Sequence, residues 1–139
     1  NIKKGQFVSP VEMAKPVAKV RSTGNGNILL TERGTFFGYN RLVNDMTSLA
    51  QMGRLAPVVF DATHSCQFPG GEGHRTGGQR QYAPHLSRAA VAAGAHALFL
   101  EIHDDPANAL SDATTVWPLD QLEVFLAPCV AIHAIVGRG

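Results

Sequence analysis

The sequence lacks any marked excess of one charge. Its 139 residues carry 12 Lys and Arg against 11 Asp and Glu, which gives a formal net charge of +1. Proteins that bind nucleic acid or a membrane surface through electrostatics usually carry a clear basic excess. We therefore expect neither nucleic acid nor a membrane as a partner, and we expect any positive cluster to be local, as around a phosphate site.

Long apolar runs, a leader and a cysteine framework are also missing. Uninterrupted apolar runs, such as residues 89–94, are much shorter than the about 20 residues that a membrane-spanning helix needs. Residues 1–4 do not lead into the apolar core of a secretory signal. The two cysteines, Cys66 and Cys129, are therefore interpreted as free thiols in a reducing compartment. These absences predict a soluble, cytoplasmic protein.

An alternation of strands and helices is present instead. Apolar, β-branched runs bounded by turn residues are typical of strands buried on both faces, and we expect such strands at 27–33, 57–64 and 95–103. Helical spacing of apolar residues predicts helices at 11–20, 42–52, 84–93 and 119–136. With residues 2–6 as the end of an earlier strand, the chain has four strand–helix units. This period indicates a parallel sheet in one α/β domain spanning residues 1–139.

The polar residues favour one kind of parallel sheet. Charged or metal-binding residues stand at the carboxyl end of every expected strand: Lys3, Lys4, Glu32, Arg33, Asp61, His64, Glu101 and His103. An open doubly wound sheet usually concentrates its site at one switch point, whereas a barrel builds its site from several strands together. The sequence thus predicts a (β/α)8 TIM barrel, with this chain covering roughly its last four units as a half barrel.

Cations at two neighbouring strand ends suit the binding of an anion. Arg33 can bind a phosphate or carboxylate with two parallel hydrogen bonds, and Lys3 or Lys4 can add a compact charge. Each of these side chains taken alone is equally consistent with a solvated charge at the end of a strand.

Metal-binding side chains follow the later strands. A His with two carboxylates suits Mn²⁺, Fe²⁺ or Zn²⁺, and His64, Glu101 and Asp112 form one such set. Their long spacing is also compatible with a structural His and two surface carboxylates, and it leaves three rival ligands open: His74, His85 and His103. Cys66 lies two residues from His64, but we expect it to pack as a small hydrophobic residue.

A glycine-rich segment follows His64. Five of the nine residues at 70–78 are glycine, which indicates a mobile loop rather than a packed one. A long loop of this kind over a barrel mouth is a candidate lid, and a plain surface loop is the alternative. The segment is not a P-loop, because no Gly-Lys-Ser/Thr ends it.

Taken together, several segments resemble the 3-deoxy-D-manno-octulosonate 8-phosphate synthases. They occur in family order and at family spacing: NIKKGQFVSP at 1–10, TERGTFFGYN at 31–40, FDATHS at 60–65, PGG at 69–71 with GG at 77–78, and ALSDA at 109–113. The resemblance implies a (β/α)8 barrel, usually a homotetramer. It also implies a transferase that condenses phosphoenolpyruvate with D-arabinose 5-phosphate for lipopolysaccharide biosynthesis.

The resemblance also implies roles for single residues. Lys3, Gln6 and Arg33 would bind the substrate phosphoenolpyruvate, and the glycine-rich segment would close over the site. His64, Glu101 and Asp112 would be the catalytic metal ligands. Ser111 and Ala113 around Asp112 resemble the metal-dependent members, in which a cysteine from the N-terminal part is the fourth ligand; the cofactor would be Fe, Zn or Mn.

The first four strand–helix units of that family have no counterpart in this chain. We therefore expect the 139 residues alone to be inactive. Two alternatives remain at this stage: a related synthase that uses erythrose 4-phosphate, and a non-catalytic half barrel that pairs with another half. The residues around Asp61 and Asp112 favour the octulosonate enzyme over the first alternative.

Overall fold

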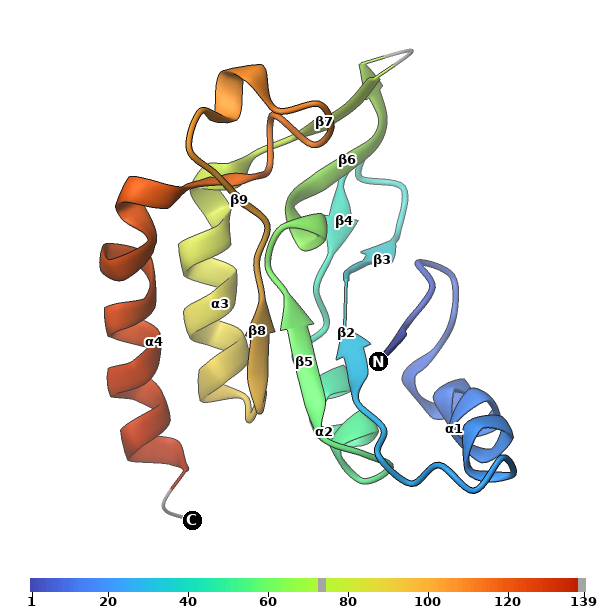
Figure 1. The fold of residues 1–139 in the computed structure, drawn as a ribbon. Coiled ribbons are helices and arrows are strands. Elements are labelled where there is room, and N and C mark those ends of the chain that lie inside the picture. The colour runs from blue at the N-terminus through green and yellow to red at the C-terminus, as the bar shows by residue number, and fades with distance from the viewer. Residues whose placement is uncertain (73–74, 138–139) are drawn as a thin grey trace.

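Four parallel strands form the centre of the molecule (Figure 1). The structure, a computed structural model, describes residues 1–72 and 75–137. The strands β1 (Ile2–Lys3), β2 (Leu30–Glu32), β5 (Val58–Asp61) and β8 (Ala97–Phe99) lie in that order in the sheet. Leu30 pairs with Ile2 on one side and with Val58 on the other.

Helices connect these strands and lie beside them. In chain order they are α1 (Ala14–Arg21), α2 (Thr47–Gly53), α3 (Ala83–Ala92) and α4 (Leu122–Val136). Figure 1 shows α1 on one side of the strands and α3 with α4 on the other. Short 3₁₀ turns accompany the helices: Pro10–Met13, His64–Cys66, Arg80–Tyr82, Pro106–Asn108 and Leu119–Gln121.

The order of the strands supports the barrel type of sheet. Strands that follow one another in the chain also lie next to one another in the sheet, with one helix in each connection. A doubly wound sheet instead reverses its order at a switch point. The described strands form an open arc with β1 and β8 at its edges, so a closed barrel is not seen in the part of the chain that the structure covers.

The hydrophobic core lies between the sheet and the helices. Leu30, Val58 and Phe60 from the strands are completely buried, and Leu49 and Met52 from α2 pack with them. Burial of each such side chain stabilises the fold by about 1.5–3 kcal/mol. The core thereby fixes the strands whose carboxyl ends carry the polar residues.

One expected helix was too long. We predicted a helix over 42–52, but Leu42–Val43 form β4, which pairs with β3 (Thr35–Phe36), and α2 begins only at Thr47. Leu42 is buried because it packs over Gly34, where a Cβ would lie 2.8 Å from the Leu42 Cβ. Asp45 then accepts hydrogen bonds from the Thr47 backbone and hydroxyl, which explains why the helix begins there.

One expected strand was also too long. The run at 95–103 divides into β8 and β9 (Ile102–His103), and β9 pairs with β10 (Trp117–Pro118) instead of the central sheet. The chain leaves the sheet at Glu101, whose backbone N–H donates to the Thr63 hydroxyl at 2.7 Å. Its carbonyl accepts from the Trp117 N–H at 2.8 Å. These two bonds replace the sheet pairing and hold Glu101 in place.

The glycine-rich segment is not the irregular loop that we expected. Residues Gln67–Glu72 form β6 and Arg75–Gly78 form β7, and the two strands pair antiparallel. Gly78 is required by close packing, since a Cβ there would collide with the Thr115 side chain. His74 lies outside the described residues.

The C-terminal helix is the most apolar helix of the described chain by the membrane-span criterion. Leu119–Val136 is an 18-residue helical segment with mean hydropathy 1.6, so it is long and apolar enough to cross a membrane by length and composition. Only 11% of that segment is buried, and its exposed side includes Val124, Val130 and Ile135. This segment is not an uninterrupted apolar run, because it contains Asp120 and Glu123, and so it is not one of the short runs on which the expectation was based. The prediction of free cysteines is confirmed, since Cys66 and Cys129 are unpaired and buried.

Candidate active site

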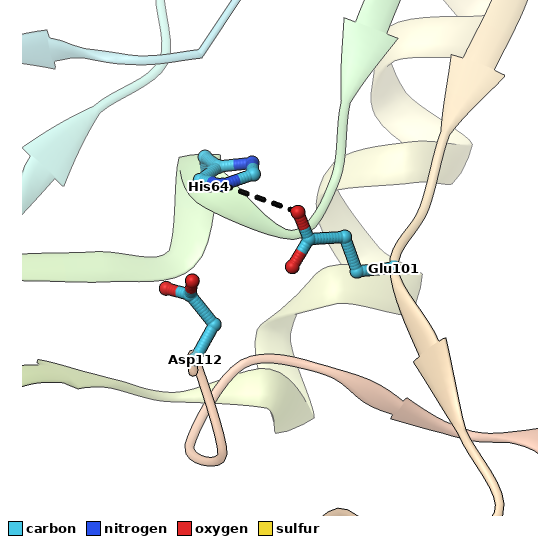
Figure 2. A group of neighbouring side chains, drawn as sticks. All are labelled: His64, Glu101 and Asp112. Atoms are coloured by element: carbon cyan, nitrogen blue, oxygen red, sulfur yellow. Dashed lines mark ion pairs between the residues drawn. The ribbon is translucent and has the colours of Figure 1, made fainter. Parts of the chain in front are cut away.

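Three side chains from three different segments meet beyond the carboxyl ends of the strands. His64 follows β5, Glu101 lies between β8 and β9, and Asp112 lies in the loop before β10. One ligand atom from each lies within 4.8 Å of the other two, and all three residues are partly exposed. Figure 2 shows the two carboxylates pointing toward the imidazole. This convergence is compatible with a divalent metal, to which it would offer one nitrogen and two oxygen donors.

The backbone at Asp112 is unusual. Its φ of 52° lies in the left-handed region, which Asp tolerates better than most residues other than glycine. The Asp112 carbonyl accepts from the Thr115 and Val116 N–H groups at 2.7 and 2.9 Å, which closes a tight turn. Arg80 donates to the neighbouring Ala113 carbonyl and anchors that turn. The fold thus holds the Asp112 carboxylate toward His64 despite the unfavourable φ.

Asp61 fixes the orientation of His64. It is completely buried at the end of β5, and its carboxylate accepts from the His64 backbone N–H at 2.9 Å and from Nδ1 at 2.8 Å. Because a carboxylate can only accept, Nδ1 carries the proton and the Nε2 lone pair is left free. Nε2 lies 3.5 Å from Glu101 Oε1, on the side where the candidate ligands meet.

Asp61 stays ionised in this position. Burial alone would raise the pKa of Asp61, but hydrogen bonds from the His64 side chain and backbone and from Lys3 outweigh it and lower that pKa. The Lys3 ammonium is 2.6 Å from Asp61 Oδ2 and 4.9 Å from the centre of the Phe99 ring. Its side chain is 39% exposed, so Lys3 keeps a face open to a bound anion.

Arg33 is connected to the ligand set through Gln67. Its Nη2 donates to Gln67 Oε1 at 2.8 Å, and Gln67 Nε2 donates to Asp112 Oδ1 at 2.7 Å. Arg33 Nε is buried and has no hydrogen-bond partner among the described residues. A buried donor without an acceptor is costly, and an anion bound beside Arg33 would satisfy it.

The remaining sequence candidates lie elsewhere. Lys4 is buried and faces Glu32 at 3.5 Å, so of the two lysines it is Lys3 that reaches the ligand set. Gln6 lines a separate cavity with Phe7 and Phe36, and the structure does not bring it to the three metal-ligand candidates.

Of the rival histidines, the two within the described residues, His85 and His103, do not join the three ligand candidates. His103 Nδ1 contacts Asp104 at 3.1 Å, and His85 on α3 stacks edge-to-face against Tyr82. Two functional residues were missed by sequence reasoning: Asp61, noted only as a polar strand end, and Gln67, noted only as part of the glycine-rich segment. The Asp61–His64 spacing of three residues was the available signal for the first, whereas the sequence carries no comparable signal for Gln67.

Comparison with known proteins defines the class to which this site belongs. The sequence matches the DAHP synthetase I family over residues 1–134, and the chain belongs to that family. Its α/β content and parallel strands fit a TIM-barrel family.

The curated relatives narrow the class to one enzyme. The chain is 61% identical over 137 residues to the 2-dehydro-3-deoxyphosphooctonate aldolase of Syntrophotalea carbinolica, covering 98% of this chain and 50% of the relative. Relatives of the same name from Xylella fastidiosa and Stenotrophomonas maltophilia are 56% and 54% identical, each over 99% of this chain and 50% of the relative. The resemblance to the octulosonate phosphate synthases is thereby confirmed. The chain spans about half the length of the curated relatives that it matches.

Proposed function

We propose that this chain is the C-terminal half of a (β/α)8-barrel synthase. The full-length enzyme condenses phosphoenolpyruvate with D-arabinose 5-phosphate and water, and releases 3-deoxy-D-manno-octulosonate 8-phosphate and phosphate. The observation that carries this proposal is the convergence of His64, Glu101 and Asp112 within 4.8 Å, with Lys3 and Arg33 each linked to the set through one side chain. The names of relatives at 54–61% identity support the substrates.

The metal-ligand candidates fit a divalent ion. Three carboxylates, Asp61, Glu101 and Asp112, outweigh the two cations near the set, so the site favours a doubly charged cation. His64 offers Nε2 as a ligand because Asp61 holds the proton on Nδ1. An iron, zinc or manganese ion bound there would orient the reacting water and lower its pKa. A fourth ligand, a cysteine, comes from the N-terminal half by family analogy.

The cations bind the negatively charged substrate. Lys3 contacts Asp61 beside His64, and Arg33 reaches Asp112 through Gln67 and keeps a buried Nε without a partner among the described residues. They neutralise the phosphate and carboxylate of phosphoenolpyruvate, and they stabilise the negative charge on the phosphate as it leaves. We assign a supporting substrate contact to Gln6 by family analogy alone.

A proton must move when the enol carbon attacks the aldehyde and water adds at the neighbouring carbon. We assign this proton transfer to Glu101, whose Oε1 lies 3.5 Å from His64 Nε2; His64 could take it over only while Nε2 is not bound to the metal. Phosphate then leaves by cleavage of its C–O bond. The product belongs to lipopolysaccharide biosynthesis, and we place the enzyme in the cytoplasm as a homotetramer by the same analogy.

The test uses the full-length protein, completed by the N-terminal half of its own gene. Phosphate release from phosphoenolpyruvate is measured with arabinose 5-phosphate and, as the control aldose, erythrose 4-phosphate. We expect turnover with the first sugar only, loss of at least about 100-fold on chelation, and recovery with added Mn²⁺ or Zn²⁺.

Other outcomes of this test identify other functions. Turnover that prefers erythrose 4-phosphate would identify the related synthase. Turnover that survives complete chelation would exclude the metal-dependent form. The 139-residue chain tested alone should be inactive, because it lacks the sugar-phosphate loops; metal binding without turnover by the full-length protein would favour a non-catalytic module.

A further inference from the structure

Two buried side chains connect the metal-ligand candidates to the anion-binding cations. Asp61 contacts Lys3 Nζ at 2.6 Å and His64 Nδ1 at 2.8 Å through the same oxygen, Oδ2. Gln67 accepts from Arg33 and donates to Asp112 at 2.8 and 2.7 Å. Each cation is therefore joined to one ligand candidate by a single intervening side chain, and the two connections come from different strands.

The orientation of the Gln67 amide is set by its two neighbours. Arg33 can only donate and the Asp112 carboxylate can only accept, so just one of the two amide orientations satisfies both. Gln67 is 9% exposed, so water cannot readily replace either bond. A change in the position of Asp112 thus acts on Arg33 through a rigid, neutral link.

Asp61 forms the second link, between Lys3 and His64. Lys3 and His64 share Asp61 Oδ2. A metal bound at His64 Nε2 would make the Nδ1–H group more polar and strengthen its hydrogen bond to that oxygen. The Asp61 carboxylate is completely buried, and it also accepts a hydrogen bond from the His64 backbone N–H at 2.9 Å. These contacts hold the carboxylate in place, so it cannot move with Lys3 independently of His64. The position of the Lys3 ammonium is therefore tied to the state of His64.

We propose that Asp61 and Gln67 are positioning residues that couple metal binding to phosphoenolpyruvate binding, an inference that rests on the proposed function. Metal bound by His64 and Asp112 fixes both links, and the links hold Lys3 and Arg33 where they meet the anion. Phosphoenolpyruvate then binds to cations that are already ordered and loses less conformational entropy. Reciprocally, a bound anion raises the affinity for the metal by the same factor.

The test measures that factor directly. Titration calorimetry on the full-length protein gives the Kd of phosphoenolpyruvate without metal and with saturating Mn²⁺, and their ratio is the coupling factor. We expect Gln67→Met to lower the ratio at least about fivefold, within the usual range of coupling energies. Methionine has nearly the same length and no charge, so the direct attraction between metal and anion is unchanged in this variant.

A second variant examines the other link. We expect Asp61→Asn to weaken Mn²⁺ binding by about 10–100-fold, as is usual when the partner of a metal-bound histidine is changed. Matched controls are Gln51→Met and Asp120→Asn, exposed residues on α2 and in the turn before α4, and they should leave the coupling factor at its wild-type value. Circular dichroism verifies that each variant is folded; should Asp61→Asn not fold, the Gln67 variant decides by itself.

The outcomes separate the two proposals. If Gln67 had a merely structural role, Gln67→Met would weaken phosphoenolpyruvate binding equally with and without Mn²⁺, and the ratio of the two Kd values would not change. An unchanged ratio, in a variant that still turns over substrate, would therefore overturn the coupling but not the proposed function. If the wild-type protein binds neither Mn²⁺ nor phosphoenolpyruvate and shows no turnover, the proposed function fails and the coupling falls with it. A lower ratio in Gln67→Met, with the same factor found when Mn²⁺ is titrated with and without phosphoenolpyruvate, supports the inference.

Discussion

Two regions of the molecule distribute charge and hydrophobic surface in opposite ways. At the carboxyl ends of the strands, Lys4, Glu32 and Asp61 are at most 2% exposed, and each faces a partner of opposite charge. On the outer side of α4, Val124 and Ile135 are 78% and 76% exposed. Soluble proteins usually bury valine and isoleucine and expose charge. The polar region is held together by contacts within this chain, whereas the outer side of α4 is open to solvent in the described structure.

The largest change in stability is expected at the buried ion pair of Lys4 and Glu32, which tests the polar side of this comparison. Lys4→Met leaves Glu32 charged, buried and facing no cation, so the free energy of unfolding should fall by about 3–5 kcal/mol. Adding Glu32→Gln removes that charge and still accepts from the Ser48 hydroxyl, which now lies 2.7 Å from Glu32. We therefore expect the double variant to recover much of the loss, as measured by urea unfolding of the full-length protein.

The matched control for this variant is Lys15→Met on α1, where the lysine is exposed. It should change the free energy of unfolding by less than about 0.5 kcal/mol. If the single Lys4→Met variant were as stable as wild type, Lys4 and Glu32 could not be desolvated. The comparison between a buried polar region and the exposed outer side of α4 would then lose its basis.

The same pair shows how far sequence reasoning reaches. Lys4 and Glu32 were correctly expected at strand ends, because apolar runs that end in polar residues reveal where a buried strand stops. Which of two adjacent lysines faces the site depends on the pleat and on the Glu32 side chain, and neither is encoded in local spacing. Strand order and the parallel sheet followed from the repeated strand–helix period, whereas the start of α2 did not.

The limits were physical at each error. Leu42 fits the helical spacing of 42–52, but it pairs with Phe36 across the β3–β4 hairpin and packs over Gly34, and helical periodicity does not test for such contacts. The glycines of 70–78 predicted mobility, yet glycine also permits the close packing found at Gly78. Gln67 was missed because its role depends on two partners, Arg33 and Asp112, that are 34 and 45 residues away.

A smaller change in the free energy of unfolding is expected at the exposed side of α4, the second region of the comparison. Val130 lies in an apolar groove with Leu119, Leu122 and Leu126, and it is 65% exposed in the 139-residue chain. If the N-terminal half of a barrel covers this groove, Val130→Ser should lower the free energy of unfolding of the full-length protein by about 1–2 kcal/mol. Urea unfolding measures this change.

Two comparisons interpret the Val130 result. Val124→Ser, at an exposed residue of α4 outside the groove, is the control and should have an effect below about 0.5 kcal/mol. A Val130→Ser variant of the full-length protein that is equally unaffected would mean that the groove stays in contact with solvent. The half-barrel proposal would then lose its explanation for the apolar surface.

The smallest change in stability concerns the Cys66 thiol, a neutral group near the charge of Asp61. Cys66 packs in the core, and burial together with the nearby Asp61 charge raises the pKa of its thiol to about 12. The folded state therefore favours the neutral thiol, whereas the unfolded chain ionises it near its ordinary pKa of about 8.5. Stability from this group is fully present below that value and is lost as pH rises toward about 12. Between about pH 8 and about pH 9 the free energy of unfolding should fall by less than about 1 kcal/mol because of Cys66.

Two alanine variants assign this pH dependence. Cys66→Ala should flatten the decline between about pH 8 and about pH 9, while Cys129→Ala should leave most of it, since the positive charge of Arg88 opposes the effect of burial on the pKa of Cys129. Urea unfolding at each pH provides the measurement. A decline that is the same in wild type and Cys66→Ala would place the cause outside this thiol. The polar region and the hydrophobic core would then differ in their side-chain contacts alone, because the ionisation of Cys66, a core residue near the Asp61 charge, would not couple them.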